Sequence, residues 1–215
     1  YGIITVLGFL LAIYIAYRIE KIHLVMIYPV AVGMLYYYSS RWKKIALVGN
    51  VVVAIFCGFV PGILLYAEWD HLLQLRDDDL QTYTFIIDIF TAYIVFAFMS
   101  TIVRELIKDV EDVIGDKAAG YRTLPVLIGT RYAKYTIVFL MIMFVCSFQL
   151  WIGSLRQSAG HILANIIIGI FVLSTLAILF KLIVANKKEH YSELSKWMKL
   201  IMIFALFVFL CIPFI

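Results

Sequence analysis

The chain has 215 residues, of which 64% are hydrophobic and only 15% are charged, and its formal net charge is +4. A soluble domain carries roughly 25% charged residues, so this composition excludes an ordinary soluble protein and indicates a polytopic membrane protein. The cations are spread between apolar runs and form no basic patch with interleaved aromatic residues, which argues against a nucleic-acid-binding protein.

Long apolar runs define the predicted elements, because roughly 17 to 25 apolar residues are needed to cross a hydrocarbon core about 30 Å thick. We predict an all-α, polytopic transmembrane helical bundle with seven spans. No internal repeat, low-complexity tract or linker interrupts the chain, so we take residues 1–215 as a single domain. The spans are expected at residues 3–17, 22–40, 45–67, 82–103, 132–153, 162–185 and 197–214.

The orientation of the bundle follows from its cations, because cytoplasmic loops carry the excess of Lys and Arg. The loops after the first, third and fifth spans contain four of the 18 Lys and Arg residues, and the other fourteen follow the second, fourth and sixth spans. We therefore predict an integral, multi-pass membrane protein in which the second set of loops, and Tyr1, lie on the cytoplasmic side.

Charged residues are concentrated in one stretch, from Arg104 to Gly129, which lies between two predicted spans. Because a charge costs a few kcal/mol in hydrocarbon, such a concentration at the mouth of a membrane bundle suggests a functional site. The stretch contains five carboxylates and four cations, namely Glu105, Asp109, Glu111, Asp112 and Asp116 with Arg104, Lys108, Lys117 and Arg122.

Helical spacing brings three of these carboxylates onto one face. If the fourth span continues as a helix through residue 116, Asp109, Asp112 and Asp116 lie within roughly 60° of one another. Three carboxylates on one face repel, so a bridging cation is expected. Magnesium commonly takes one or two carboxylates together with substrate phosphates, which makes a magnesium-bound diphosphate the simplest ligand. Lys108, Lys117 and Arg122 are then placed to bind its outer oxygens.

A plainer interpretation of this stretch is a solvated loop of surface ion pairs, each worth about 0–1 kcal/mol. That interpretation is preferred for a second acidic cluster, Asp77 to Asp79, because consecutive residues point in different directions on a helix. Asp88 lies inside the fourth predicted span, where we favour a structural hydrogen bond over a substrate role.

The run from Lys108 to Gly129 also resembles a known motif. It is similar to the second aspartate-rich motif of the UbiA-type intramembrane prenyltransferases, which has two aspartates four residues apart, followed by a glycine and Thr-Leu-Pro. A second segment, from Tyr38 to Asn50, resembles the tyrosine and lysine segment of that family, which ends in Gly-Asn. The matching residues are Asp109, Asp112, Asp116, Gly120, Thr123, Leu124 and Pro125 in the first run, and Tyr38, Lys43, Gly49 and Asn50 in the second.

The chain departs from the family pattern at one point. The family has nine spans and a first aspartate-rich motif, an asparagine followed by two aspartates at four-residue spacing, and this sequence does not contain that motif. Seven spans that begin on the cytoplasmic side fit a chain without the first two. We therefore expect a truncated member with half of the family's metal site.

The resemblance implies a magnesium-dependent transfer of a prenyl group from a prenyl diphosphate to a lipophilic acceptor within the membrane. The acceptor would be a quinone precursor, an aromatic compound or a glycerol-phosphate lipid. The expected partners are these substrates and membrane lipids, with no nucleic acid and no required protein partner. The implied roles are metal binding by Asp109, Asp112 and Asp116; catalysis by Asp112, Asp116, Tyr38 and Lys43; and diphosphate binding by Lys108, Lys117, Arg122 and Asn50.

Two alternatives from other functional classes remain. A cation transporter could also have a basic mouth and an acidic helix end, but it would be expected to carry several acids deep within its spans, where only Asp88 qualifies. A non-catalytic prenyl-lipid-binding protein would account for the missing first motif as readily as truncation does.

Overall fold

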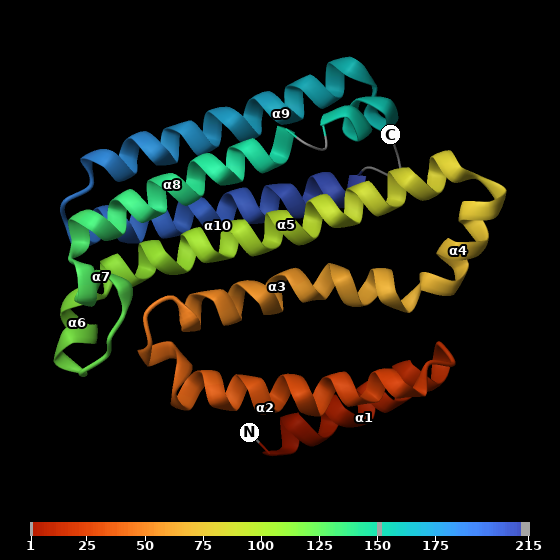
Figure 1. Ribbon diagram of the computed structural model, residues 1–215, viewed down its shortest axis with the longest axis horizontal. Coiled ribbons are helices and arrows are strands. Elements are labelled where there is room, and N and C mark those ends of the chain that lie inside the picture. The colour runs from red at the N-terminus through yellow and green to blue at the C-terminus, as the bar shows by residue number, and fades with distance from the viewer. Residues whose placement is uncertain (1, 150–151, 212–215) are drawn as a thin grey trace.

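The computed structural model describes the backbone of residues 2–149 and 152–211, and the side chains of these ranges except at 148–161, 163, 164 and 209–211. Its regular elements in the described ranges are all helical, which confirms the predicted all-α class (Figure 1). In chain order they are α1 (Gly2–Arg18), η1 (Ile22–Met26), α2 (Ile27–Ser40), η2 (Trp42–Lys44), α3 (Val48–Ala67), α4 (Trp69–Asp78), α5 (Leu80–Glu111), α6 (Val113–Ala118), α7 (Leu124–Ile128), α8 (Thr130–Gln149), α9 (Ile152–Val184) and α10 (Lys188–Cys211).

Five helical segments in the described part of the chain are long and apolar enough to cross a membrane. α1 is also apolar but has only 17 residues. Each predicted span overlaps a helix, although only five segments have the length and hydropathy of a span and α5 extends well beyond its predicted end at residue 103. The predicted spans 132–153 and 197–214 include residues 150–151 and 212–214, which lie outside the described residues. These helices support an integral membrane bundle. The five segments are Ile22–Lys44, Val48–Ala67, Leu80–Glu111, Thr130–Ser147 and Asn165–Val184.

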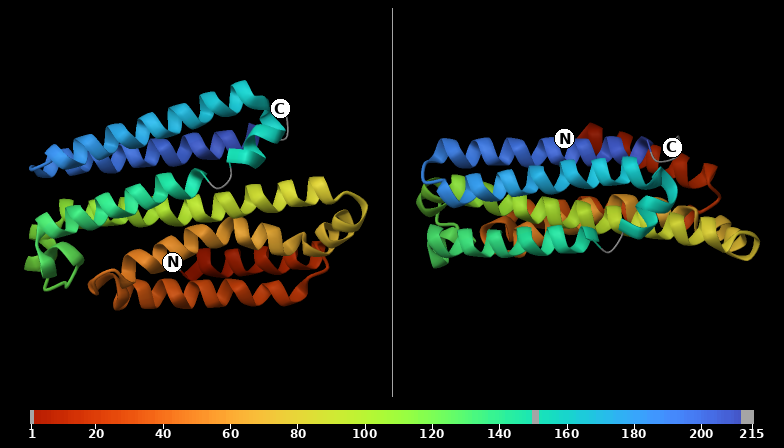
Figure 2. Two further views of the ribbon diagram at one scale, coloured as in Figure 1. Left: turned by 45° about the horizontal axis from the view of Figure 1, so that its top comes forward. Right: turned by 90° about the horizontal axis from the view of Figure 1, so that it is seen from above.

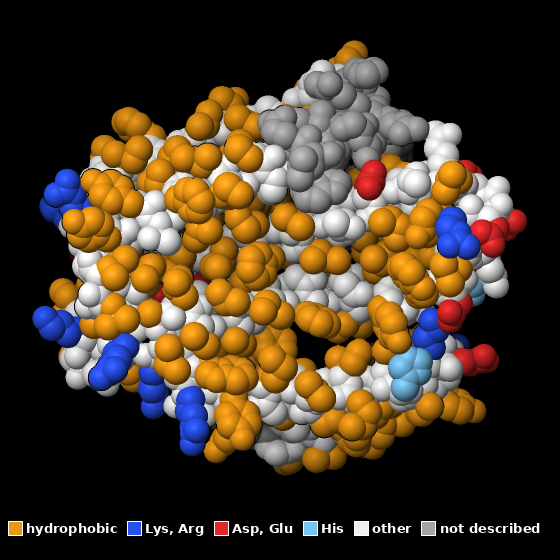
Figure 3. Space-filling model, viewed as in Figure 1, with side chains coloured by type: hydrophobic (Ala, Val, Ile, Leu, Met, Phe, Trp, Pro, Cys, Tyr) orange, Lys and Arg blue, Asp and Glu red, His pale blue; other side chains and the backbone are white. Residues whose placement is uncertain are grey.

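The helix α5 lies at the centre of the bundle and contacts α3, α4, α8, α9 and α10. Figure 1 and the left view of Figure 2 show α1 and α2 on one side of it and α9 and α10 on the other. Aromatic rings join α5 to two of these helices: the ring of Phe96 lies 5.3 Å from that of Phe144 in α8 and 6.0 Å from that of Phe171 in α9. Large apolar side chains cover the outside of the bundle, as a lipid-facing surface requires (Figure 3).

Small residues allow α3 and α5 to approach closely. Ala54 is fully buried, and a Cβ added to Gly58 would lie 3.3 Å from the carbonyl oxygen of Ile94. Close backbone approach of this kind is the usual way in which helices associate in a membrane, where apolar burial supplies little driving force. The pairing of α3 with α5 fixes the position of the loop that precedes α3.

The two ends of the bundle differ in charge. We call one of them the basic end; there the chain connects α2 to α3, α5 to α8 and α9 to α10, and Lys and Arg side chains project outward (Figure 3). At the opposite end the ammonium of Lys21 lies 2.7 Å from a carboxylate oxygen of Asp70. This hydrogen bond and charge lower the pKa of the Asp70 carboxyl.

The cluster Asp77 to Asp79 also lies at the opposite end and is exposed, as predicted, but it is not a simple loop. Asp77 and Asp78 complete α4, whereas Asp79 is the N-cap of α5. Its side chain accepts hydrogen bonds of 3.1 Å from the backbone amides of Gln81 and Thr82, which satisfies donors that a helix start leaves free. The acid therefore has a structural role.

Candidate functional site

Two segments that are far apart in the sequence meet at the basic end. The backbone amide of Arg122 donates a 2.8 Å hydrogen bond to the carbonyl of Lys44, and Ile45 and Arg122 form an isolated parallel β-bridge. The loop around η2 and the loop between α6 and α7 therefore lie side by side. These are the two segments that the sequence motifs single out.

A glycine, Gly49, allows the η2 turn to pack closely against the first turn of α3. A Cβ on Gly49, in the first turn of α3, would lie 2.9 Å from the Cα of Lys43 and 3.1 Å from the carbonyl oxygen of Trp42. Leu47, just before α3, has a φ of 63°, a left-handed conformation that is uncommon for a residue other than glycine. The η2 turn is thus packed tightly onto the start of α3.

A second glycine shapes the other loop. α6 ends in a Schellman motif, in which the amide of Tyr121 donates to the carbonyl of Asp116 at 2.9 Å and the amide of Gly120 donates to that of Lys117 at 3.2 Å. Gly120 has a φ of 71°, as the motif requires. The chain then turns into α7, where Pro125 occupies the first turn. The glycine of the sequence motif thus ends α6, and its Thr-Leu-Pro starts α7.

The expected continuous helix through residue 116 is interrupted. α5 ends at Glu111, Asp112 has φ −97° and ψ 7°, and α6 begins at Val113. Two helical hydrogen bonds nevertheless cross the break: the Asp112 amide donates to the Lys108 carbonyl, and the Asp116 amide donates to the Asp112 carbonyl, both at 2.9 Å. The condition of a continuous helix through residue 116 is therefore met only in part, because the backbone bends at Asp112.

Each of the three aspartates contacts a different element. Asp109 accepts a 2.9 Å hydrogen bond from the side-chain amide of Asn50 in α3. Asp112 lies 3.5 Å from the ammonium of Lys188 in α10. Asp116 accepts a 3.0 Å hydrogen bond from the hydroxyl of Thr123, just before α7. Among the described residues no three His, Cys, Asp or Glu side chains converge as a ready-made metal site.

Asp109, Asp112 and Asp116 are all half-buried, and Glu105 and Asp116 act electrostatically on Asp109. Glu105 has no role in either sequence motif. The spacing of residues 105, 109, 112 and 116 matches one helical face, and that signal could have added Glu105 to the set.

The tyrosines of the η2 side differ in their surroundings. Tyr38 is half-buried and lies within electrostatic range of Glu105 and Asp109. Tyr36 and Tyr37 are exposed, and the Tyr37 ring stacks on Trp42 with centroids 5.9 Å apart. Among these three tyrosines, Tyr38 is the one that is half-buried and within electrostatic range of the acids of α5.

Both loops carry cations. The ammonium groups of Lys43 and Lys44 lie 6.0 and 5.7 Å from the centroid of the Tyr121 ring, so lysines of the η2 loop contact an aromatic ring of the α6–α7 loop. Lys108, Lys117 and Arg122 are exposed at the same end. Their side chains are accessible to an anion that approaches the carboxylates.

The donor set fits magnesium, because carboxylate oxygens are the ligands that this hard cation prefers. Magnesium usually keeps several waters or substrate oxygens and takes only one or two protein carboxylates. Asp109 in α5, Asp112 at the break and Asp116 in α6 do not converge, so they leave coordination positions for such other oxygens. The residues available to hold it are Asp109, Asp112 and Asp116.

The fold and this site define a polytopic membrane protein with a carboxylate face and accessible cations at one end of its bundle. The chain belongs to the UbiA prenyltransferase family, whose family model matches residues 1–207. This match confirms the resemblance inferred from the two sequence motifs.

Two similar proteins are both named digeranylgeranylglyceryl phosphate synthase. The chain is 32% identical over 171 residues to a digeranylgeranylglyceryl phosphate synthase of Methanosphaera stadtmanae, a match that covers 78% of this chain and 55% of that protein. It is 33% identical over 122 residues to the synthase of Thermococcus kodakarensis, covering 55% of this chain and 38% of that protein. The chain thus spans about half the length of the curated relatives it matches, or less.

A solved structure supports the fold. It is described as giving structural and mechanistic insights into the biosynthesis of digeranylgeranylglyceryl phosphate synthase in membranes. The two structures superpose with a TM-score of 0.64 over 97% of this chain and 66% of the other, at 23% sequence identity. At this identity the likeness concerns the arrangement of the helices.

Proposed function

We propose that this protein transfers a prenyl group from a prenyl diphosphate to the hydroxyl of a glycerol-phosphate lipid, in a magnesium-dependent reaction within the membrane. The observation that carries the proposal is the meeting of the η2 loop, which contains Lys43 and Lys44, with the α6–α7 loop, which contains Arg122 and follows the aspartates of α5 and α6. The names of the relatives favour a glycerol-phosphate lipid over a quinone precursor or another aromatic acceptor.

In the proposed reaction the bond between the allylic carbon and the diphosphate oxygen breaks, and a bond from the acceptor hydroxyl oxygen to that carbon forms. The hydroxyl proton is released. Bound magnesium, held by Asp109, Asp112 and Asp116, would supply positive charge to the leaving diphosphate. Hydrogen bonds to the diphosphate oxygens would come from Lys43, Lys108, Lys117 and Arg122. Such donors stabilise the negative charge that develops on the leaving diphosphate.

Two other residues have proposed supporting roles. Asn50 would hold the Asp109 carboxylate in place through their 2.9 Å hydrogen bond. The ring of Tyr38 would stabilise positive charge on the allylic carbon, because the face of an aromatic ring attracts cations. A bundle interior lined by apolar side chains would exclude water that could hydrolyse the diphosphate.

The membrane arrangement is part of the proposal. We infer seven spans, with α1 and α10 joining the five segments that meet the length and hydropathy of a span. The basic end, and with it the active-site loops, would face the cytoplasm because it carries most of the Lys and Arg residues.

The test is an assay of prenyl transfer in liposomes with magnesium, labelled geranylgeranyl diphosphate and a glycerol-phosphate lipid that already carries one geranylgeranyl chain. Asp112→Ala and Asp116→Ala should each lower the rate by about 100-fold or more. Asp77→Ala, an exposed acid at the opposite end, is the control and should keep the rate. Unchanged turnover in both site variants would reject the assignment, and diphosphate binding without turnover in the unaltered protein would favour a non-catalytic prenyl-lipid-binding protein.

A further inference from the structure

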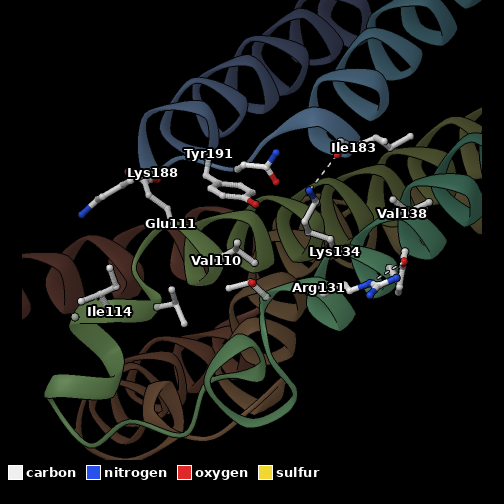
Figure 4. A pocket seen from close by; sticks show the side chains of 14 residues that line it. Val110, Glu111, Ile114, Arg131, Lys134, Val138, Ile183, Lys188 and Tyr191 are labelled. Atoms are coloured by element: carbon white, nitrogen blue, oxygen red, sulfur yellow. Dashed lines mark hydrogen bonds between the residues drawn. The ribbon is translucent and has the colours of Figure 1, made fainter.

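An open cavity with a charged side and an apolar side lies at the basic end, apart from the meeting point of the two loops. It has a volume of about 770 Å³ and is bordered by the end of α5, α6, α8 and the connection from α9 to α10. Figure 4 shows Glu111, Lys188 and Tyr191 on one side of it and Arg131, Lys134 and Val138 on the other. None of its lining residues comes from η2 or α3.

The charged lining is predominantly basic. Arg131, Lys134 and Lys188 contribute three cations, against the single carboxylate of Glu111. Arg131 is exposed, and the side chain of Lys188 is 65% exposed. These two cations are accessible from outside the protein, and the lining as a whole favours an anion.

Lys134 is held in place within the cavity. Its ammonium donates hydrogen bonds of 3.1 Å to the carbonyl of Ile183 and 2.7 Å to that of Ala185, at the C-terminal end of α9 (Figure 4). The hydroxyl of Tyr191 donates to the same Ala185 carbonyl at 3.0 Å. Since two backbone carbonyls hold the Lys134 side chain, this group need not be ordered when a ligand binds.

The remaining lining is apolar. Val110, Val113, Ile114, Val138 and Ile183 form walls beside the cations, and Ile114 and Ile183 are exposed toward the surroundings of the bundle. A soluble anion would use the cations and leave these walls in contact with water. An anionic lipid uses both, because its phosphate meets the cations while its glycerol and the start of its acyl chains cover the apolar walls.

We propose that this cavity binds the phosphate head group of an anionic glycerophospholipid from the surrounding membrane. Arg131 and Lys188 bind the phosphate oxygens and Lys134 supplies fixed positive charge. Lys188 also lies 3.5 Å from Asp112, so the lipid is held next to the carboxylate face. The binding itself does not depend on the proposed prenyl transfer and is measured without turnover.

The test is native mass spectrometry of the purified protein in detergent with equal amounts of phosphatidylglycerol and phosphatidylcholine. The unaltered protein should retain phosphatidylglycerol in preference, and the double variant Arg131→Gln, Lys188→Gln should reduce that preference at least about five-fold. The matched control Lys196→Gln, Lys199→Gln removes two exposed cations of α10 that do not line the cavity and should keep it. Equal loss, or no loss, in both double variants overturns the proposal.

Two further variants separate the cavity from general charge. Val138→Phe fills the apolar side without altering charge and should also reduce phosphatidylglycerol retention, whereas Glu111→Gln removes the only carboxylate of the lining and should increase it. Circular dichroism confirms that each variant is folded. Displacement of the lipid by an equal concentration of inorganic phosphate would show a site for free phosphate and overturn the lipid assignment.

Discussion

Gly49 provides a sharp test of the way in which the η2 loop is packed against α3. Replacing it with alanine adds a Cβ that would lie 2.9 Å from the Cα of Lys43 and 3.1 Å from the carbonyl oxygen of Trp42. Both are backbone atoms, so no flexible side chain can move aside. The turn that carries Lys43 must shift, and the backbone contact between Lys44 and Arg122 must follow.

The size of the effect can be worked out from a matched control. Gly33 lies within α2, and a Cβ added there meets nothing within 4 Å. Gly33→Ala should therefore gain about 0.5–1 kcal/mol, the usual benefit of alanine over glycine within a helix. Gly49→Ala has the same benefit but also incurs about 1–3 kcal/mol of overpacking. The two variants should differ by about 1–3 kcal/mol in the free energy of unfolding.

The measurement combines stability with activity. Thermal unfolding in detergent should give Gly49→Ala an apparent midpoint at least about 2 °C below that of Gly33→Ala, since 1 kcal/mol corresponds to about 2–4 °C in a chain of this size. Prenyl transfer should fall in Gly49→Ala alone, because only that variant displaces Lys43. Equal midpoints and equal rates in the two variants would refute the packing of η2 onto α3.

Two further predictions concern single hydrogen bonds. Thr123→Val removes the donor to Asp116 while keeping the side-chain shape, and should lower the free energy of unfolding by about 1 kcal/mol. It should also raise the magnesium concentration that half-maximal prenyl transfer requires. The control Thr136→Val, on the α8 surface, should leave that concentration unchanged. The Asp70 pKa is lowered by Lys21, so the contribution of that pair is present at neutral pH and lost as pH falls through the folded-state pKa. The unaltered protein and Lys21→Gln should thus differ in thermal unfolding midpoint by a constant amount from pH 8 to about pH 5, and this difference should shrink below about pH 4. A difference that stays constant at all pH values would contradict the stabilising role of the pair.

The sequence predicted the helices well, because apolar length in a membrane protein leaves little choice of structure. It predicted less well where helices stop. The residue at position 112 does not predict a break in the helix, because it is neither glycine nor proline. The bend accompanies the turn of α6 toward α7. Contacts within a few residues, such as the turn at Gly120, could be anticipated from the motif.

Contacts between distant residues could not be predicted in the same way. Lys188 reaches Asp112 from the start of α10, and no local pattern relates the two positions. The hydrogen bond between Asn50 and Asp109 likewise depends on how α3 packs against α5, which the small residues Ala54 and Gly58 determine. Glu105 was a different omission, because its helical spacing was visible in the sequence.

The backbone contact between Lys44 and Arg122 has a consequence for how this site can vary between related proteins. Main-chain atoms hold the two loops together, so the side chains of both residues can change without altering the distance between the loops. Substitutions can therefore change the side chains that contact a substrate while the backbone arrangement of the two loops is kept. Substrate preference and the architecture of the site can then evolve separately.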